Sequence, residues 1–149
     1  MLVIRRDLVE AIVEHARRDH PDEACGVVAG PSADRPERFV PMLNAARSPT
    51  FYEFESGDLL RLYREMDAND EVPAVVYHSH TATEAYPSRT DISYASEPEA
   101  HYVLVSTRPE LGADPETVEF RSFRIVDGQV TEEPVQVLEG VAGAPEERR

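Results

Sequence analysis

The chain has 149 residues, of which 41% are hydrophobic, so we expect one globular domain that buries a single core. Its 29 acidic and 15 basic residues give a formal net charge of −14, which argues against a nucleic acid partner because a phosphate backbone would be repelled. No stretch approaches the roughly 18 apolar residues of a membrane span, and the N-terminal segment breaks into charge too early for a signal peptide, so we expect a cytoplasmic protein with no membrane contact.

The first half of the chain predicts a helix followed by strands. Apolar residues at helical spacing indicate an amphipathic helix that starts near Asp7 and ends before Pro21. The glycine-bounded run "ACGVVAG" at residues 24–30 is typical of a buried strand. "RFVPMLNAA" and "FYEFE" predict further strands or extended segments.

A second helix is expected next, with Ser56 as its N-cap. The buried strand "VPAVVYHSH" follows, then a polar loop and a helix that starts at Ser88. The apolar face expected on the second helix consists of Leu59, Leu60, Tyr63 and Met66.

The C-terminal part predicts the strand "HYVLVST" and then a hairpin that turns at Asp127-Gly128. Residues 139–149 have the composition of a disordered tail, which leaves residues 1–138 as the domain. The order of helices and strands, without internal repeats, predicts a mixed α/β or α+β fold.

Two histidines at the end of "VVYHSH" suggest a metal site. Side chains alternate along a strand, so His78 and His80 point to the same face. The loop that follows is long enough to fold back and present Asp91 as a third ligand, which would leave one position open for water. The alternative is a chance H-x-H in which Ser88 and Asp91 serve only as a helix N-cap and a first-turn acid.

A hydrolytic site also needs a base to take a proton from water. Glu23 stands at the head of the strand "ACGVVAG" and can supply the carboxylate, although taken alone it reads as a solvated loop residue. The single cysteine, Cys25, excludes a cysteine-rich zinc site and is expected to be buried rather than nucleophilic. We assign no function to the remaining histidines, which we expect on the surface or in strands: His15, His20 and His101.

The combination of "PDEACGVVAG" with the later pattern H-x-H-x7-S-x2-D resembles the JAMM (MPN+/Mov34) zinc metallopeptidases, over roughly residues 2–125. The resemblance implies a curved mixed β-sheet flanked by helices and one zinc ion per chain. It assigns zinc binding to His78, His80 and Asp91, the role of general base to Glu23, and stabilisation of the oxyanion to Ser88.

Within this family the chain is similar to the small stand-alone bacterial members that act on ubiquitin-like sulfur-carrier proteins. That likeness implies hydrolysis of a peptide or isopeptide bond after a C-terminal Gly-Gly, with release of an amino acid such as cysteine in cysteine biosynthesis. A catalytically inactive MPN-type scaffold is the alternative, and the oligomeric state stays open. The zinc nucleobase deaminases are excluded because their P-C-x-x-C motif is missing. RadC proteins also differ, because they typically have the sequence H-N-H-P-S-G where this chain has H-S-H-T-A-T.

Overall fold

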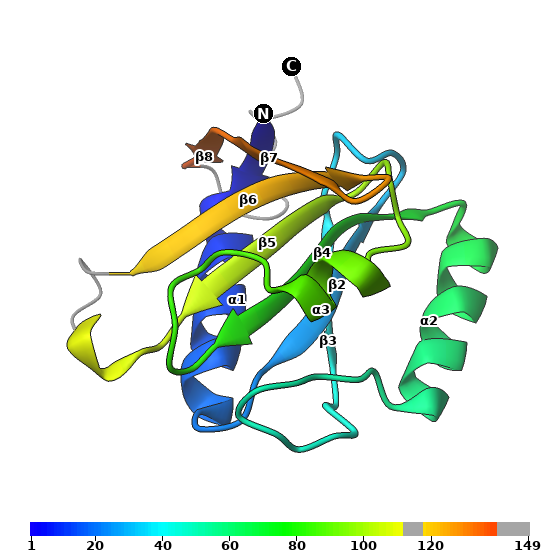
Figure 1. The fold of residues 1–149 in the computed structure, drawn as a ribbon. Helices are drawn as coiled ribbons and strands as arrows, with labels where there is room; N and C mark the ends of the chain where they lie inside the picture. The colour runs from blue at the N-terminus through cyan, green and yellow to red at the C-terminus, as the bar shows by residue number, and fades with distance from the viewer. Residues whose placement is uncertain (112–117, 140–149) are drawn as a thin grey trace.

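The protein folds around a six-stranded mixed sheet with the strand order β3-β2-β4-β5-β6-β7 (Figure 1). The structure is a computed structural model that describes residues 1–111 and 118–139. Only β4 and β5 run parallel within this sheet, and the other neighbours are antiparallel. In chain order the elements are β1 (Leu2–Arg5), α1 (Arg6–Asp19), β2 (Cys25–Gly30), β3 (Arg38–Met42), α2 (Ser56–Asn69), β4 (Val72–His80), α3 (Arg89–Tyr94), β5 (His101–Ser106), η1 (Pro109–Leu111), β6 (Glu119–Val126), β7 (Gln129–Glu133) and β8 (Val135–Leu138).

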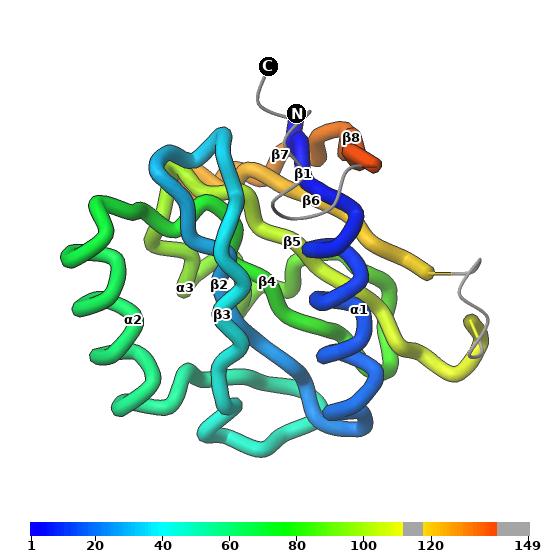
Figure 2. The backbone as a smooth tube through the Cα atoms, turned by 180° about the vertical axis from the view of Figure 1, so that it is seen from behind, coloured from blue at the N-terminus to red at the C-terminus, as the bar shows by residue number. Residues whose placement is uncertain are grey.

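Helix α1 covers one face of the sheet, as the view from behind shows (Figure 2). Its apolar stripe, which includes Leu8 and Ile12, packs on Val75 and Tyr77 of β4. The alternate residue of β4, Val76, faces the other side, which α2 and α3 partly cover. Strand β4 therefore lies between two strands and between two layers, which explains why its sequence is apolar on both faces.

The mixed α+β architecture is confirmed, as are the helices and strands predicted at 7–20, 24–30, 72–80 and 101–107 and the hairpin at Asp127-Gly128. Both hairpin residues have positive φ, 52° and 76°, as a tight turn between twisted strands requires. The segment "FYEFE" is extended but forms only an isolated bridge between Asn44 and Phe54. The tail predicted at 139–149 lies outside the described residues from position 140 onward.

Helix α2 corrects two predictions. Its N-cap is Glu55 rather than Ser56, because the Glu55 carboxylate accepts a hydrogen bond from the Asp58 backbone N–H at 2.9 Å. The buried face was also wrong in part, since Leu60 and Tyr63 are both 52% exposed. The residues of α2 that are fully buried are Leu62 and Met66.

The sequence did not predict the two-stranded parallel sheet of β1 and β8. The expected place of His15 was also wrong, because this side chain is buried in α1 with Nδ1 2.6 Å from the Tyr77 hydroxyl. His101 is buried in β5 and bonds to Glu133. None of the helices within residues 1–111 and 118–139 has the length and apolar character needed to cross a bilayer.

Candidate metal centre

The two histidines of β4 lie at the carboxyl end of the parallel pair β4 and β5, where open sheets usually bind their ligands. Both side chains are buried, with relative exposures of 3% for His78 and 6% for His80. They share the face of the sheet that α1 does not cover, as strand alternation predicts, and their Nε2 atoms are 3.2 Å apart.

Helix α3 brings Asp91 to the same point. Asp91 Oδ2 lies 3.1 Å from His78 Nε2 and 3.0 Å from His80 Nε2. The helix begins with a capping box in which Ser88 Oγ accepts from the Asp91 N–H and Asp91 Oδ2 accepts from the Ser88 N–H. The predicted N-cap at Ser88 is therefore confirmed, and the cap holds the carboxylate in place.

The hydrogen bonds of His80 define which of its nitrogens can bind a cation. His80 Nδ1 is 2.9 Å from the Glu84 carbonyl oxygen, which can only accept, so Nδ1 carries the proton and donates. The lone pair of Nε2 then points at Asp91 Oδ2. Two acceptors at such a distance repel each other unless a proton or a metal ion lies between them.

The chemistry of the donor set fits a metal ion, and its spacing is slightly tighter than that of ligands around one. Ligand atoms about 2.0–2.2 Å from one tetrahedral ion lie about 3.3–3.6 Å apart. The three donor atoms, on His78, His80 and Asp91, are mutually separated by 3.0–3.2 Å. Two imidazoles and one carboxylate leave a tetrahedral ion one free position, the arrangement of catalytic rather than structural sites.

Burial and neighbouring groups shift the pKa values of the three donors in different directions. Burial lowers the pKa of His78, so its imidazole is neutral. Burial would raise the pKa of Asp91, but hydrogen bonds from His78 and His80 outweigh it and the pKa is lowered. Burial alone would lower the pKa of His80. The hydrogen bond and the charge of the Asp91 carboxylate together outweigh burial, so the pKa of His80 is raised.

The loop between His80 and Ser88 is anchored to the sheet. Ser106 Oγ of β5 donates to the Thr83 carbonyl at 2.6 Å. The Arg121 guanidinium lies 5.7 Å from the Tyr86 ring centroid and 3.6 Å from the Glu84 carboxylate. These contacts fix the Glu84 carbonyl that orients His80.

Glu23 precedes β2 and is held beside the histidines by its main chain. Its N–H donates to the Ser48 carbonyl at 2.9 Å, and its carbonyl accepts from Asn44 Nδ2 at 3.0 Å. The next residue, Ala24, donates to Ser79 Oγ at 2.8 Å, which ties the segment to β4 between the two histidines.

The side chain of Glu23 is only 5% exposed. Burial raises its pKa to about 7, while His80 lowers it and Asp91 raises it, so the carboxylate is electrostatically coupled to the donor set. A carboxylate with a pKa in this range can accept a proton and release it near neutral pH. The solvated-loop alternative for Glu23 is therefore wrong.

Two residues of the site were not assigned a role from the sequence. The Tyr52 ring stacks on the His78 imidazole, with centroids 4.5 Å apart. Asn44 donates to the Glu23 and Phe51 carbonyls and accepts from two backbone N–H groups, which closes the segment that carries Tyr52. Asn44 lies in the predicted extended segment "RFVPMLNAA", which gave it no role, and no pattern indicated Tyr52. Cys25 takes no part, because it is fully buried and burial raises its pKa to about 12.

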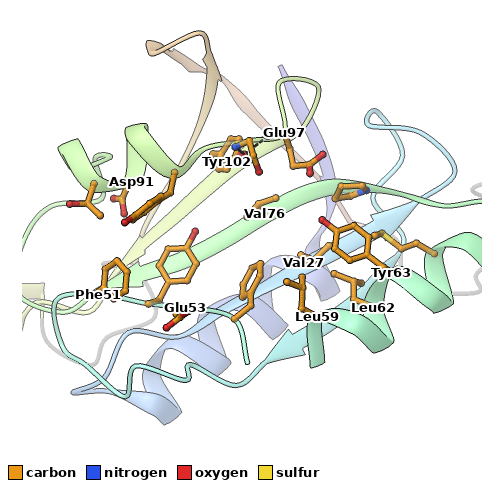
Figure 3. Close-up of a pocket in the computed structure, with 17 residues that line it drawn as sticks. Val27, Phe51, Glu53, Leu59, Leu62, Tyr63, Val76, Asp91, Glu97 and Tyr102 are labelled. Carbon is orange, nitrogen blue, oxygen red and sulfur yellow. Dashed lines mark hydrogen bonds between the residues drawn. The ribbon is translucent and has the colours of Figure 1, made fainter. Parts of the chain in front are cut away.

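A cavity of about 450 Å³ opens beside Asp91 (Figure 3). Its floor contains Val76 of β4 and Val27 of β2, and α2 forms one wall. Asp91 and Phe51 stand at one end, and Leu62 and Tyr63 at the other. One donor of the candidate metal centre, Asp91, therefore also lines a mainly apolar cavity.

Comparison with known proteins agrees with this geometry. The sequence model of the family described as prokaryotic homologs of the JAB domain matches residues 5–126. The CysO-cysteine peptidase of Mycobacterium tuberculosis is 68% identical over 140 residues, which cover 93% of this chain and 92% of that protein. Desampylase of Haloferax volcanii is 32% identical over 111 residues, which cover 70% of this chain and 80% of that protein.

Solved structures share the fold. Protein DSY2949 from Desulfitobacterium hafniense aligns with a TM-score of 0.79 and 30% identity, covering 95% of each chain. A protein described as JAMM, a metalloprotease-like zinc site in the proteasome and signalosome, aligns with a TM-score of 0.53 and 19% identity, covering 93% of this chain and 99% of that one. With the family match over most of the chain, these likenesses show that the protein belongs to the prokaryotic JAB-domain family and is a hydrolase of the JAMM type.

Proposed function

We propose that the protein is a zinc-dependent peptidase that cuts the amide bond after the C-terminal Gly-Gly of a ubiquitin-like sulfur-carrier protein. The observation that supports this most directly is the convergence of three donor atoms, on His78, His80 and Asp91, beside the buried carboxylate of Glu23. The names of the two similar proteins, CysO-cysteine peptidase and desampylase, support this class of substrate. The amino acid released is cysteine or another single residue, and we place the reaction in cysteine biosynthesis.

In this proposal one zinc ion per chain is held by His78, His80 and Asp91. When bound, zinc polarises the scissile carbonyl and makes water a better nucleophile at neutral pH. Glu23 accepts the proton of the attacking water and delivers it to the leaving amine, which then departs neutral. The carboxylate is suited to both steps because burial has brought its pKa to about 7.

Ser88 has one hydrogen-bonding capacity left after capping α3. Its oxygen accepts from the Asp91 N–H at 3.1 Å, so the hydroxyl proton remains available to donate. We assign that proton to the negative charge that develops on the scissile carbonyl oxygen, an interaction worth about 3 kcal/mol where such donors have been removed. Capping and catalysis are then compatible roles of one side chain.

The proposal places the protein in the cytoplasm and treats residues 1–138 as one catalytic domain without nucleic acid or membrane contacts. Two glycines suit the tail of the carrier, because a backbone without side chains can pass close to buried ligands. The tail enters extended, as peptides do when they bind along strands and grooves.

The experiment combines metal analysis with cleavage. Purified protein should contain one zinc per chain and should remove a single C-terminal amino acid from a sulfur carrier that ends in Gly-Gly-Cys, as followed by intact mass. A carrier that ends in Gly-Val-Cys should not be cut. Metal-loaded protein that binds the carrier without cutting it would support the scaffold alternative, and rapid cutting of an unrelated unstructured peptide would indicate a general peptidase.

A further inference from the structure

The cavity beside Asp91 is too large for the small part of the substrate. Its volume of about 450 Å³ lies in the range of about 300–1,000 Å³ that holds drug-sized ligands. The reaction under "Proposed function", on which this inference rests, releases one amino acid on one side of the cut bond and leaves the carrier on the other. Only the carrier side is long enough to occupy the whole cavity.

The lining defines which side chains the cavity accepts. Aromatic and aliphatic groups form most of it, among them Val27, Tyr52, Leu59 and Val76. The ionisable side chains that line it are carboxylates and tyrosines, with carboxylates on Glu53, Asp91 and Glu97. An apolar side chain therefore gains by burial there, whereas an acidic one would be desolvated beside like charges.

The position of Asp91 fixes the register of the tail. Asp91 belongs both to the metal centre and to one end of the cavity. An extended chain advances about 3.3 Å per residue, so two glycines span about 7 Å from the cut bond. The first side chain that can enter the cavity belongs to the residue that precedes the glycine pair.

We propose that this cavity is a specificity pocket for an apolar side chain immediately before the Gly-Gly of the carrier tail. The pocket selects among carriers before any bond is broken, so its effect falls on substrate binding rather than on the chemical step. Leu59 of α2 is one of the residues that form its wall.

The test uses one sulfur carrier made with tails Xaa-Gly-Gly-Cys, in which Xaa is leucine, aspartate or glycine. With the wild-type enzyme the leucine tail should have a KM at least tenfold below that of the aspartate tail. Leu59→Trp should raise the KM of the leucine tail at least tenfold and should raise the KM of the glycine tail by a much smaller factor. Leu60→Trp is the matched control, because Leu60 is the next residue of α2 and is exposed outside the cavity.

Binding of the cut carrier, which ends in Xaa-Gly-Gly, gives a readout that does not depend on turnover. Its dissociation constant, measured by calorimetry, should be lower for the leucine tail than for the aspartate tail. For the leucine tail it should rise in Leu59→Trp and stay unchanged in Leu60→Trp. If Leu59→Trp does not fold, Leu59→Ala enlarges the cavity and should shift the preference from leucine to phenylalanine. Equal KM values for the leucine and aspartate tails, or equal effects of the two tryptophan variants, would show that the cavity is not a specificity pocket. Failure to cut any tail overturns the proposed function instead.

Discussion

His80 uses one ring nitrogen to donate to the Glu84 carbonyl and presents the other to Asp91. Its orientation is therefore set by the loop that follows β4, and not by the strand alone. His78 is held differently, by the stacked ring of Tyr52. The two imidazoles are prepared before a metal arrives, so ion binding costs little reorganisation of these side chains.

Replacing Glu23 with glutamine separates metal binding from proton transfer. The amide has nearly the shape of the carboxylate but cannot take a proton from water. Glu23→Gln should bind zinc at the wild-type stoichiometry and lose at least a hundredfold in kcat. Metal analysis and carrier cleavage on the same sample provide the measurement, and near-normal turnover by a metal-loaded variant would remove Glu23 from the mechanism.

Ser88→Ala tests whether the cap residue also acts in catalysis. Loss of the cap should cost about 1 kcal/mol of unfolding free energy. If the hydroxyl also donates to the developing oxyanion, kcat should fall about a hundredfold or more while KM changes little, since that bond strengthens only as charge develops. Urea unfolding and steady-state kinetics measure the two effects, and a variant that loses only stability would confine Ser88 to capping.

Strand alternation predicts that His78 and His80 share a face, and the loop length allows Asp91 to join them, because both depend on local spacing. The resemblance to the JAMM family is what assigned all three residues to one site. The contacts of Tyr52 and Asn44 could not be predicted in this way. They depend on a segment of irregular backbone whose path is set by hydrogen bonds to residues far along the chain. The contact of Ser79 could not be predicted either, because its hydrogen bond from the Ala24 N–H joins residues 55 positions apart.

At the scale of elements, β2 and β4 must approach closely for Glu23 to reach the histidines. Gly26 is the register partner of Tyr77 in this pair. A Cβ at Gly26 would lie 2.4 Å from the Tyr77 hydroxyl oxygen. That hydroxyl cannot move freely, because it is buried and lies 2.6 Å from His15 Nδ1.

Gly26→Ala should therefore destabilise the fold by about 1–3 kcal/mol, as overpacked cores do. Gly57→Ala is the control, because its nearest contact is the end of the Glu55 side chain at 3.0 Å, which can shift slightly and keep its capping bond to Asp58. It should change the unfolding free energy by less than about 1 kcal/mol. Urea unfolding of both variants is the measurement, and a Gly26→Ala variant as stable as the wild type would mean that Tyr77 is not fixed.

The elements that the sequence predicted well have either helical periodicity or a long apolar run, as α1 and β4 do. Strands β1 and β8 have neither, since each has only four residues and their pairing joins positions such as Leu2 and Val135. The error on α2 has another cause. Leu60 and Tyr63 fit an apolar stripe, but the helix lies at the side of the sheet and covers it with a narrower face, which leaves both side chains about half exposed.

For the whole molecule, buried titratable groups make stability depend on pH. Burial lowers the pKa of His15 below its ordinary 6.5, so below that pH the unfolded chain binds a proton that the folded chain does not. The unfolding free energy should fall as pH drops through 6.5. Glu133 contributes at lower pH. Burial would raise the pKa of Glu133, but hydrogen bonds from His101 and Ser122 outweigh burial and lower it. The stabilisation of the fold by the Glu133 carboxylate is therefore lost as the pH falls below about 4.5.

His15→Gln isolates the first of these contributions. The variant should lose less stability than the wild type between pH 7 and pH 5, because no imidazole remains to be protonated in the unfolded chain. Urea unfolding at several pH values, with both proteins loaded with zinc, gives the two curves. Parallel curves would show that the environment of His15 does not depress its pKa.

Removal of the metal should loosen one part of the molecule and leave the rest intact. Helix α3 has only six residues and no fully buried side chain, so its position depends on its ends and on Asp91. Without a metal ion, Asp91 Oδ2 is held to the histidines only through hydrogen bonds, 3.0 Å from His80 Nε2, and these constrain the helix less than coordination to an ion would. Strand β5, in contrast, is buried along its whole length and is paired on both sides.

Amide hydrogen exchange of zinc-loaded and chelated protein should therefore differ by at least tenfold in residues 89–94 and by much less in β5, because local opening of α3 exposes little apolar surface. Returning zinc should restore protection in the wild type. In Asp91→Ala, exchange of α3 should be fast with or without zinc, because the link between the helix and the histidines is gone. Equal protection of α3 in the loaded and chelated wild type would mean that the capping box alone holds Asp91, and that the metal adds nothing to the position of the helix.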